Sequence, residues 1–281
     1  MATVTLVELL LLGAIWGGSF LFLRMAAPEV GIAPLVEVRL VLGAAVLLPF
    51  LWRERARLPR LPWLKLTGIG LLNSTVPFLL FSWAAQRAPA GISALSNALV
   101  VPFAAAVAWA LYDEPITARR AWGLGAGLAG IVVLAGDRIA GGFAWPAALA
   151  GTCGALCYSL AVNLVRHHLK GLPASATAAA TLLGPALLTL PAAWATWPTH
   201  PISPVAWVAA ALLGVLCTGA AYVIYYRLIH RIGAPRAATV TYLVPLFGVF
   251  WAWLVLGEPV TARMALSGAL ILGGVALTQR A

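Results

Sequence analysis

Two charged residues lie inside an apolar run that predicts a helix over 34–52, namely Glu37 and Arg39. Arg39 lies about 7–9 Å from the start of this helix, at about 1.5 Å per residue. Three roles suit it: a structural pairing within the protein, an extension toward the polar surface, or contact with an anionic ligand. Side chains two positions apart point to different faces, so Glu37 and Arg39 are not expected to pair. Glu37 is either a site of proton exchange or a carboxylate near the helix end.

Polar residues precede prolines in three further apolar runs. Asn73 lies about 15 Å into a helix predicted over 63–86, and its amide needs a partner on another helix or on a ligand. Pro77 follows closely, so we expect the helix to open there and free backbone carbonyls. Asn97 precedes Pro102 in the same way, and Tyr242 precedes Pro245. These prolines either only kink their helices or place polar groups around a cavity.

Aromatic residues near the middle of predicted helices complete the candidate set. Trp16 lies midway along 4–24, and Tyr158 holds the corresponding place in 143–165. Most other tryptophans lie near helix ends, which is typical of an interfacial belt. The predicted ligand-binding residues are Trp16, Arg39, Asn73, Asn97, Tyr158, Tyr222 and Tyr242, with Glu37 as the candidate for proton coupling.

The sequence predicts no catalytic, metal or cofactor site. Cys153 and Cys157 share one face of a predicted helix, but two thiols are too few for a structural zinc site. No phosphate-binding Gly-Lys loop occurs, so no ATP-driven step is expected. The neighbouring His167 and His168, beside Lys170, are the densest group of potential catalysts, and a basic loop accounts for them more simply.

Composition places the chain in a membrane. It has 281 residues, of which 62% are hydrophobic and 9% charged, whereas soluble domains carry about 25% charged residues. Runs of about twenty apolar residues can each cross a bilayer as a helix. Ten such helices are predicted, over 4–24, 34–52, 63–86, 91–112, 118–136, 143–165, 173–195, 204–227, 235–256 and 261–279. The net charge of +10 then reports orientation and contact with anionic lipid, and nucleic acid is not an expected partner.

Lysine and arginine are distributed unequally between the two sides. With a cytoplasmic N-terminus, thirteen fall in the inner connections and the C-terminus, and four fall outside. Positive residues concentrate on the cytoplasmic side. We therefore expect a multi-pass protein of the inner membrane with both termini in the cytoplasm.

One long segment occurs twice. Residues 100–119 read VVPFAAAVAWALYDEPITAR, and residues 243–263 read LVPLFGVFWAWLVLGEPVTAR. Weaker similarities relate 14–24 to 155–166 and 86–91 to 230–235. Duplication of a whole half follows, with repeats over 1–137 and 138–281. Five helices per repeat is an odd number, so the second repeat enters from the opposite side, and such folds bind substrates near the midplane between the repeats.

These features together resemble a known family. Ten predicted helices, the Trp16-Gly17 pair, Arg39 within the second helix and the repeated proline-to-Glu-Pro hairpin are similar to the EamA-type branch of the drug/metabolite transporter superfamily. The resemblance implies an inner-membrane carrier, often an exporter of amino acids or related metabolites. It does not fix the substrate.

The leading hypothesis is a secondary transporter that works by alternating access. Its partners would be a small-molecule substrate and the bilayer. Transport would occur by proton coupling, by exchange or by facilitated diffusion, and the protein would be a monomer or a homodimer. An alternative is a membrane-embedded enzyme or lipid-handling protein, which would need catalytic groups at the membrane surface. A third hypothesis is a sensor or assembly subunit that does not transport, and the lack of a soluble domain argues against it.

Overall fold

The computed structural model describes residues 3–54, 61–136, 138–139, 142–169 and 172–279. These residues form a bundle of helices with one short hairpin. The first repeat contains α1 (Thr3–Val30), α2 (Ile32–Glu54), α3 (Trp63–Gly70), the π-helical turn η2 (Leu71–Thr75), α4 (Val76–Ala85), α5 (Ala90–Asn97), α6 (Val100–Tyr112) and α7 (Ala118–Ala135). The second contains β1 (Arg138–Ile139), β2 (Gly142–Phe143), α8 (Trp145–His168), α9 (Ala174–Ala195), α10 (Pro204–Gly214), the π-helical turn η3 (Val215–Ala220), α11 (Ala221–Ile232), α12 (Ala234–Ala237), α13 (Val240–Leu256) and α14 (Ala262–Gln279).

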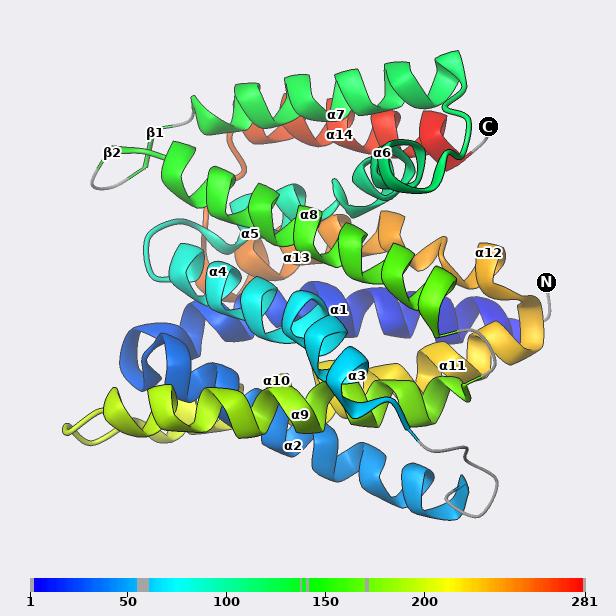
Figure 1. Ribbon diagram of the computed structural model, residues 1–281. Coiled ribbons are helices and arrows are strands. Elements are labelled where there is room, and N and C mark those ends of the chain that lie inside the picture. The colour runs from blue at the N-terminus through cyan, green and yellow to red at the C-terminus, as the bar shows by residue number, and fades with distance from the viewer. Residues whose placement is uncertain (1–2, 55–60, 137, 140–141, 170–171, 280–281) are drawn as a thin grey trace.

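The helices lie side by side and run between two ends of the bundle (Figure 1). In the described residues, eight segments are long and apolar enough to cross a membrane, and two shorter apolar helices, Val240–Leu256 and Ala262–Thr278, follow them. This agrees with the ten predicted spans. α1 runs away from the end that carries both termini, whereas α8 runs toward it (Figure 1). The second repeat is therefore inverted relative to the first, as predicted.

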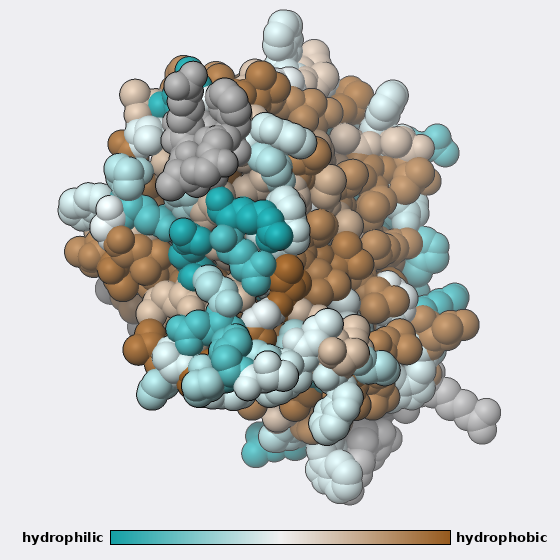
Figure 2. All heavy atoms as spheres, turned by 90° about the vertical axis from the view of Figure 1, so that its left-hand side faces the viewer, coloured by the Kyte–Doolittle hydropathy of each residue, from teal (hydrophilic) through white to brown (hydrophobic). Residues whose placement is uncertain are grey.

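Hydrophobic side chains cover much of the outside. Leu64, Trp122 and Trp194 are 89%, 76% and 81% exposed, which would be unfavourable in water and is ordinary against lipid. Figure 2 views the hairpin end of the bundle, where hydrophilic side chains gather over the middle of the face and hydrophobic ones flank them. The surface therefore suits a protein whose sides contact the bilayer and whose ends contact water.

The third predicted helix of each repeat is interrupted by a π-helical turn. η2 contains Asn73 and lies just before Pro77, whose missing N–H cannot bond to the carbonyl of Asn73. The predicted opening of this helix is confirmed. η3 lies at the equivalent place of the second repeat, where Gly214 and Gly219 pack against Leu42 and Val46 of α2. π-helical turns occur often at functional sites.

The fourth predicted helix of each repeat is also divided. α5 ends at Asn97 and α6 begins at Val100, while α12 ends at Ala237 and α13 begins at Val240. Each break comes shortly before a proline, Pro102 or Pro245. Both repeats therefore interrupt their fourth helix upstream of the repeated proline.

The repeated segment folds the same way twice. α6 ends at Asp113 with a left-handed φ of 53°, and α13 ends at Gly257 with a left-handed φ of 65°. The next N–H, of Glu114 or Glu258, donates to a carbonyl six residues earlier at 3.2 Å, which is a standard helix C-cap. Threonine then begins the next helix, because Thr117 and Thr261 accept hydrogen bonds from backbone N–H groups three residues on, at 3.3 and 3.0 Å.

Candidate binding cavity

A cavity of about 240 Å³ lies between the two repeats. The first repeat lines it from α1, α2, η2, α4, α5 and α6, and the second from α8, η3, α11 and α13. Six of the seven predicted ligand-binding residues are among those that line it: Trp16, Arg39, Asn73, Asn97, Tyr158 and Tyr222. The structure therefore brings these six together from segments that are far apart in the chain.

Arg39 is held by the second repeat. Its Nε donates a hydrogen bond of 2.9 Å to the hydroxyl of Thr218 in η3. Its guanidinium carbon lies 3.6 Å from the centre of the Phe78 ring, a cation–π contact. Arg39 does not extend outward, since it is 7% exposed. The expected structural pairing is present, with Thr218 and Phe78 as the partners, and no carboxylate of the described residues lies within 4.0 Å of it.

The terminal nitrogens of Arg39, Nη1 and Nη2, make no hydrogen bond to the residues that the structure describes. A guanidinium presents five N–H donors in a planar fork that matches a carboxylate. Thr218 binds Nε and the Phe78 ring covers one face of the guanidinium, so the orientation of the guanidinium is fixed. The N–H donors of Nη1 and Nη2 remain available at the cavity. This arrangement suits the recognition of an anionic group.

Aromatic rings, two amides and aliphatic side chains form much of the rest of the wall. Tyr158 stacks with Phe81 at 6.2 Å, and Trp16 contacts Tyr225 at 5.2 Å. Asn73, on the π-helical turn η2, and Tyr222 of α11 line the same cavity. The lining thus combines one cation with apolar faces and neutral polar groups, which is typical of a site for a small amphipathic molecule.

The EamA-like transporter family model matches residues 4–136 and again 145–280. The chain belongs to this family. The transporter is 26% identical to an uncharacterized transporter of Archaeoglobus fulgidus, over 94% of this chain and 93% of the relative. A solved structure described as "Crystal structure of protein" aligns with this chain at a TM-score of 0.68 and 21% identity. The alignment covers 99% of this chain and 96% of the other, so the two chains share one fold.

Tyr242 lies outside the cavity lining of the transporter. Its hydroxyl donates to the carbonyl of Val275 in α14 at 3.2 Å, and its side chain packs against the hydrophobic cluster that contains Ile92, Ala148 and Ile271. The preceding residue, Thr241, lines the cavity instead. Successive residues of a helix point about 100° apart, so the proline spacing located the correct turn of α13 but the wrong side chain.

Glu37 is separated from both the cavity and Arg39. It is 6% exposed and accepts a 2.5 Å hydrogen bond from the Thr189 hydroxyl of α9. The expectation that Glu37 and Arg39 do not pair agrees with this geometry. Its carboxylate has therefore been placed against α9, away from the surface that would contact a substrate.

The sequence did not single out several residues of the lining. The most important is Thr218, which holds Arg39, and the others include Phe20, Phe78 and Cys217. Small polar residues between Gly214 and Gly219 in an apolar run were a usable signal for Thr218. Phe78 had no such signal, because an apolar residue in an apolar run is ordinary.

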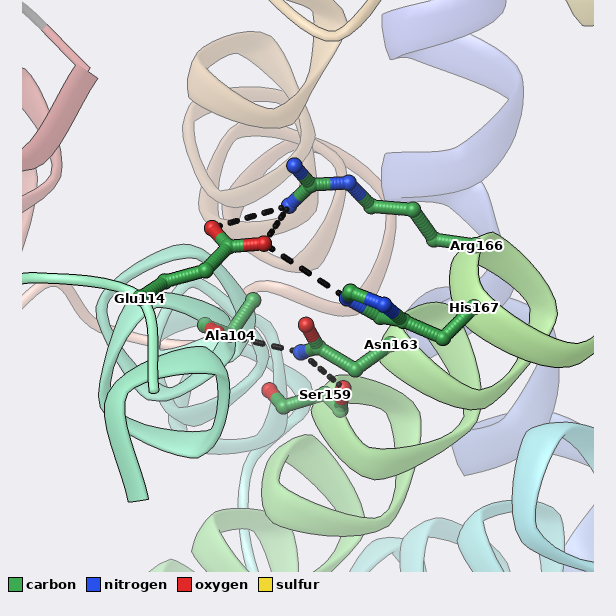
Figure 3. A network of polar contacts seen from close by, with 6 residues as sticks. All are labelled: Ala104, Glu114, Ser159, Asn163, Arg166 and His167. Atoms are coloured by element: carbon green, nitrogen blue, oxygen red, sulfur yellow. Dashed lines mark hydrogen bonds and ion pairs between the residues drawn. The ribbon is translucent and has the colours of Figure 1, made fainter. Parts of the chain in front are cut away.

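His167, the first of the paired histidines, belongs to a network of polar contacts that also contains Glu114 and Arg166 (Figure 3). His167 stacks on Tyr112 with ring centres 3.8 Å apart, and its Nε2 lies 3.5 Å from Glu114 Oε1. His168 meets the edge of Tyr112 at 6.1 Å. Lys170 lies outside the described residues. These contacts link the end of α8 to the end of α6 and to the turn that follows it.

Proposed function

We propose that this EamA-like transporter is a secondary carrier that exports amino acids or related small metabolites by alternating access. The observation that carries the proposal is Arg39, which lines a cavity between inverted repeats and whose terminal nitrogens make no hydrogen bond to the described part of the chain. In the proposed complex the substrate carboxylate accepts hydrogen bonds from this fork, and charge-assisted bidentate pairs of this kind combine strength with directional specificity.

The remaining lining supports a substrate of amino-acid size. About 240 Å³ is below the roughly 300–1,000 Å³ of most small-molecule sites, which favours a compact ligand. The rings of Trp16 and Tyr158 offer faces for an apolar side chain, and they attract an ammonium group through cation–π contacts. The amide oxygens of Asn73 and Asn97 are further acceptors for that ammonium.

Exchange or facilitated transport fits the lining best as the driving mode. No carboxylate of the described residues lines the cavity, so a substrate-coupled proton has no acceptor there. Glu37, outside the cavity, remains the candidate for proton coupling. Flux measured in liposomes with and without an imposed pH gradient separates these modes.

We further propose that both termini lie in the cytoplasm and that the bilayer is the inner membrane. Thirteen basic residues on the terminal side against four on the other support this orientation. Figure 1 places both termini at the same end of the bundle. Protease digestion of terminal tags in intact cells and in inside-out vesicles tests the proposal, and digestion of tags in intact cells would contradict it.

The proposed substrate class is tested by thermal stabilisation of purified protein against a panel of amino acids. A ligand that binds only the folded state raises the melting temperature. Arg39→Gln, which keeps a polar side chain but removes the charge, is expected to weaken binding about 10- to 100-fold. Arg87→Gln is the matched control, because Arg87 is an exposed arginine that lies over Trp83. Equal binding by the wild type and Arg39→Gln would contradict the role of Arg39.

A further inference from the structure

The two Glu-Pro turns each make an ion pair with the opposite repeat. Glu114 follows α6 of the first repeat, and its carboxylate lies 2.9 Å from Arg166 Nη1 of α8 in the second repeat (Figure 3). Glu258 follows α13 of the second repeat, and its Oε1 lies 3.5 Å from Arg24 Nε of α1 in the first repeat. Each glutamate therefore links the turn before the last helix of its own repeat to a helix of the other repeat.

The two arginines are equivalent as well. Arg24 ends the segment 14–24 of α1, and Arg166 ends the similar segment 155–166 of α8. The same contact is thus made twice under the inverted symmetry, once at each end of the bundle. The α6–α7 turn lies at the end that carries both termini, and the α13–α14 turn lies at the hairpin end (Figure 1).

The helices joined by these ion pairs also enclose the cavity. Val100 of α6 and Val162 of α8 line it, and so do Leu23 of α1 and Val244 of α13. Separation of α6 from α8 would open the cavity toward the termini. Separation of α13 from α1 would open it toward the hairpin end.

We propose that these two ion pairs are the gates of the transport cycle: the first gate is Glu114–Arg166 and the second gate is Glu258–Arg24. The structure holds both gates closed. Alternating access then consists of breaking one pair while the other remains intact, so the two glutamates bias the conformational equilibrium in opposite directions. This inference rests on the proposed alternating-access function.

The contacts around the first gate suit reversible opening. The Arg166 side chain is 60% exposed, and exposed ion pairs shift an equilibrium only about five-fold or less. Below the ion pair, the α6–α8 contact includes two hydrogen bonds to carbonyls, from Ser159 to Val100 at 2.8 Å and from Asn163 to Ala104 at 3.0 Å. Such single contacts can be exchanged for water as the helices separate.

The second gate is more enclosed. Glu258 Oε2 also accepts a 2.8 Å hydrogen bond from the N–H of Ala90, and Arg24 Nη1 donates to the carbonyl of Ala85 at 2.7 Å. Gly17 of α1 packs so closely on Phe247 of α13 that a Cβ there would lie 2.6 Å from the Phe247 Cβ. The two gates thus share their ion pair but differ in the contacts that accompany it.

Cys217 provides a native probe for the test. It lines the cavity and is 1% exposed, and the chain has three cysteines. Substitution of Cys153 and Cys157 with alanine leaves Cys217 as the single thiol. Its modification by a membrane-impermeant methanethiosulfonate is then measured from each face, in right-side-out and inside-out vesicles.

Opposite effects of the two glutamates are the expected result. Glu114→Gln should raise the labelling rate from the face on which Glu114 lies by about two- to five-fold and lower it from the other face. Glu258→Gln should do the reverse. Asp113→Asn is the matched control, since Asp113 lies in the same turn, is exposed, and makes no ion pair among the described residues. Glu114→Arg combined with Arg166→Glu should restore the original rates.

Three results would overturn the inference, and they separate it from the function on which it rests. In the first result, Cys217 of the parent protein, which lacks Cys153 and Cys157, is labelled from both faces, but the two glutamate variants change the labelling rates in the same direction or not at all. The assignment of the gates is then wrong, while alternating access stands. If the exchanged pair fails to restore labelling although size-exclusion chromatography shows a folded protein, direct pairing is wrong. If Cys217 labels from only one face, both the gates and alternating access are wrong.

Discussion

Arg39 in α2 donates the hydrogen of its Nε to the hydroxyl of Thr218 in η3, 2.9 Å away, and so joins the first repeat to the second across the cavity. The same hydroxyl donates to the carbonyl of Leu213 at 2.9 Å, a bond that spans five residues of the π-helical turn. One threonine therefore both fixes the orientation of the guanidinium and satisfies backbone freed by irregular helix geometry.

Thr218→Val should destabilise the transporter and weaken substrate binding. The variant keeps the shape of the side chain but leaves a buried charged donor and a carbonyl without partners, which costs about 1.5–3 kcal/mol. The melting temperature and the affinity for the substrate should both fall. Thr218→Ser retains the hydroxyl and is the control. A variant Thr218→Val with unchanged melting temperature would show that water replaces the hydroxyl at little cost.

Phe78 is expected to tune the affinity of Arg39. Its ring centre lies 3.6 Å from the guanidinium carbon, and cation–π contacts contribute about 0.5–2 kcal/mol, depending on desolvation. Phe78→Leu should therefore weaken substrate binding several-fold, whereas Phe78→Tyr, which keeps an aromatic face, should not. Isothermal titration of both variants measures the difference, and equal losses would indicate a packing effect instead.

The sequence predicted the framework of the site better than its details. Apolar runs of bilayer length are a strong signal, and the duplicated Glu-Pro segment revealed the repeats. Pro77 marked η2, because a missing N–H is a local defect that a sequence can show. No proline follows η3 in α11. Gly214 and Gly219 are needed where α10 and η3 approach Leu42 and Val46 of α2, and this need depends on a helix far away in the chain.

Side-chain direction was the second limit. Thr241 and Tyr242 share one turn of α13, and only the phase of the helix decides which of them lines the cavity. Thr218 gained its role from Arg39, 179 residues away. Such pairings are set by tertiary packing, so a single sequence names the helices that meet but not the atoms that touch.

Two neighbouring glycines of α14 should respond differently to alanine. A Cβ on Gly274 would lie 2.4 Å from the carbonyl oxygen of Gly123 in α7, whereas a Cβ on Gly273 would meet nothing within 4 Å. Gly274→Ala should therefore lower stability by about 1–3 kcal/mol by forcing α7 and α14 apart. Gly273→Ala should be neutral or stabilising, since alanine favours helix by up to about 1 kcal/mol. Thermal unfolding of the two variants, compared in one detergent, tests the contact, and equal melting temperatures would contradict it.

Glu37→Gln should separate proton coupling from substrate binding. Glu37 contacts Thr189 and lies outside the cavity lining, so a neutral amide there should leave the binding constant and substrate exchange unchanged. If Glu37 carries the coupled proton, the same variant should lose any acceleration of flux by a pH gradient, because glutamine cannot take up and release a proton. Thr189→Val is the companion variant, since it keeps the carboxylate but removes its hydrogen-bond donor and should retain the response. If the wild-type protein responds to the pH gradient and Glu37→Gln responds equally, the coupled proton is carried by another residue. If Glu37→Gln loses substrate binding instead, the contact of α2 with α9 helps to position Arg39.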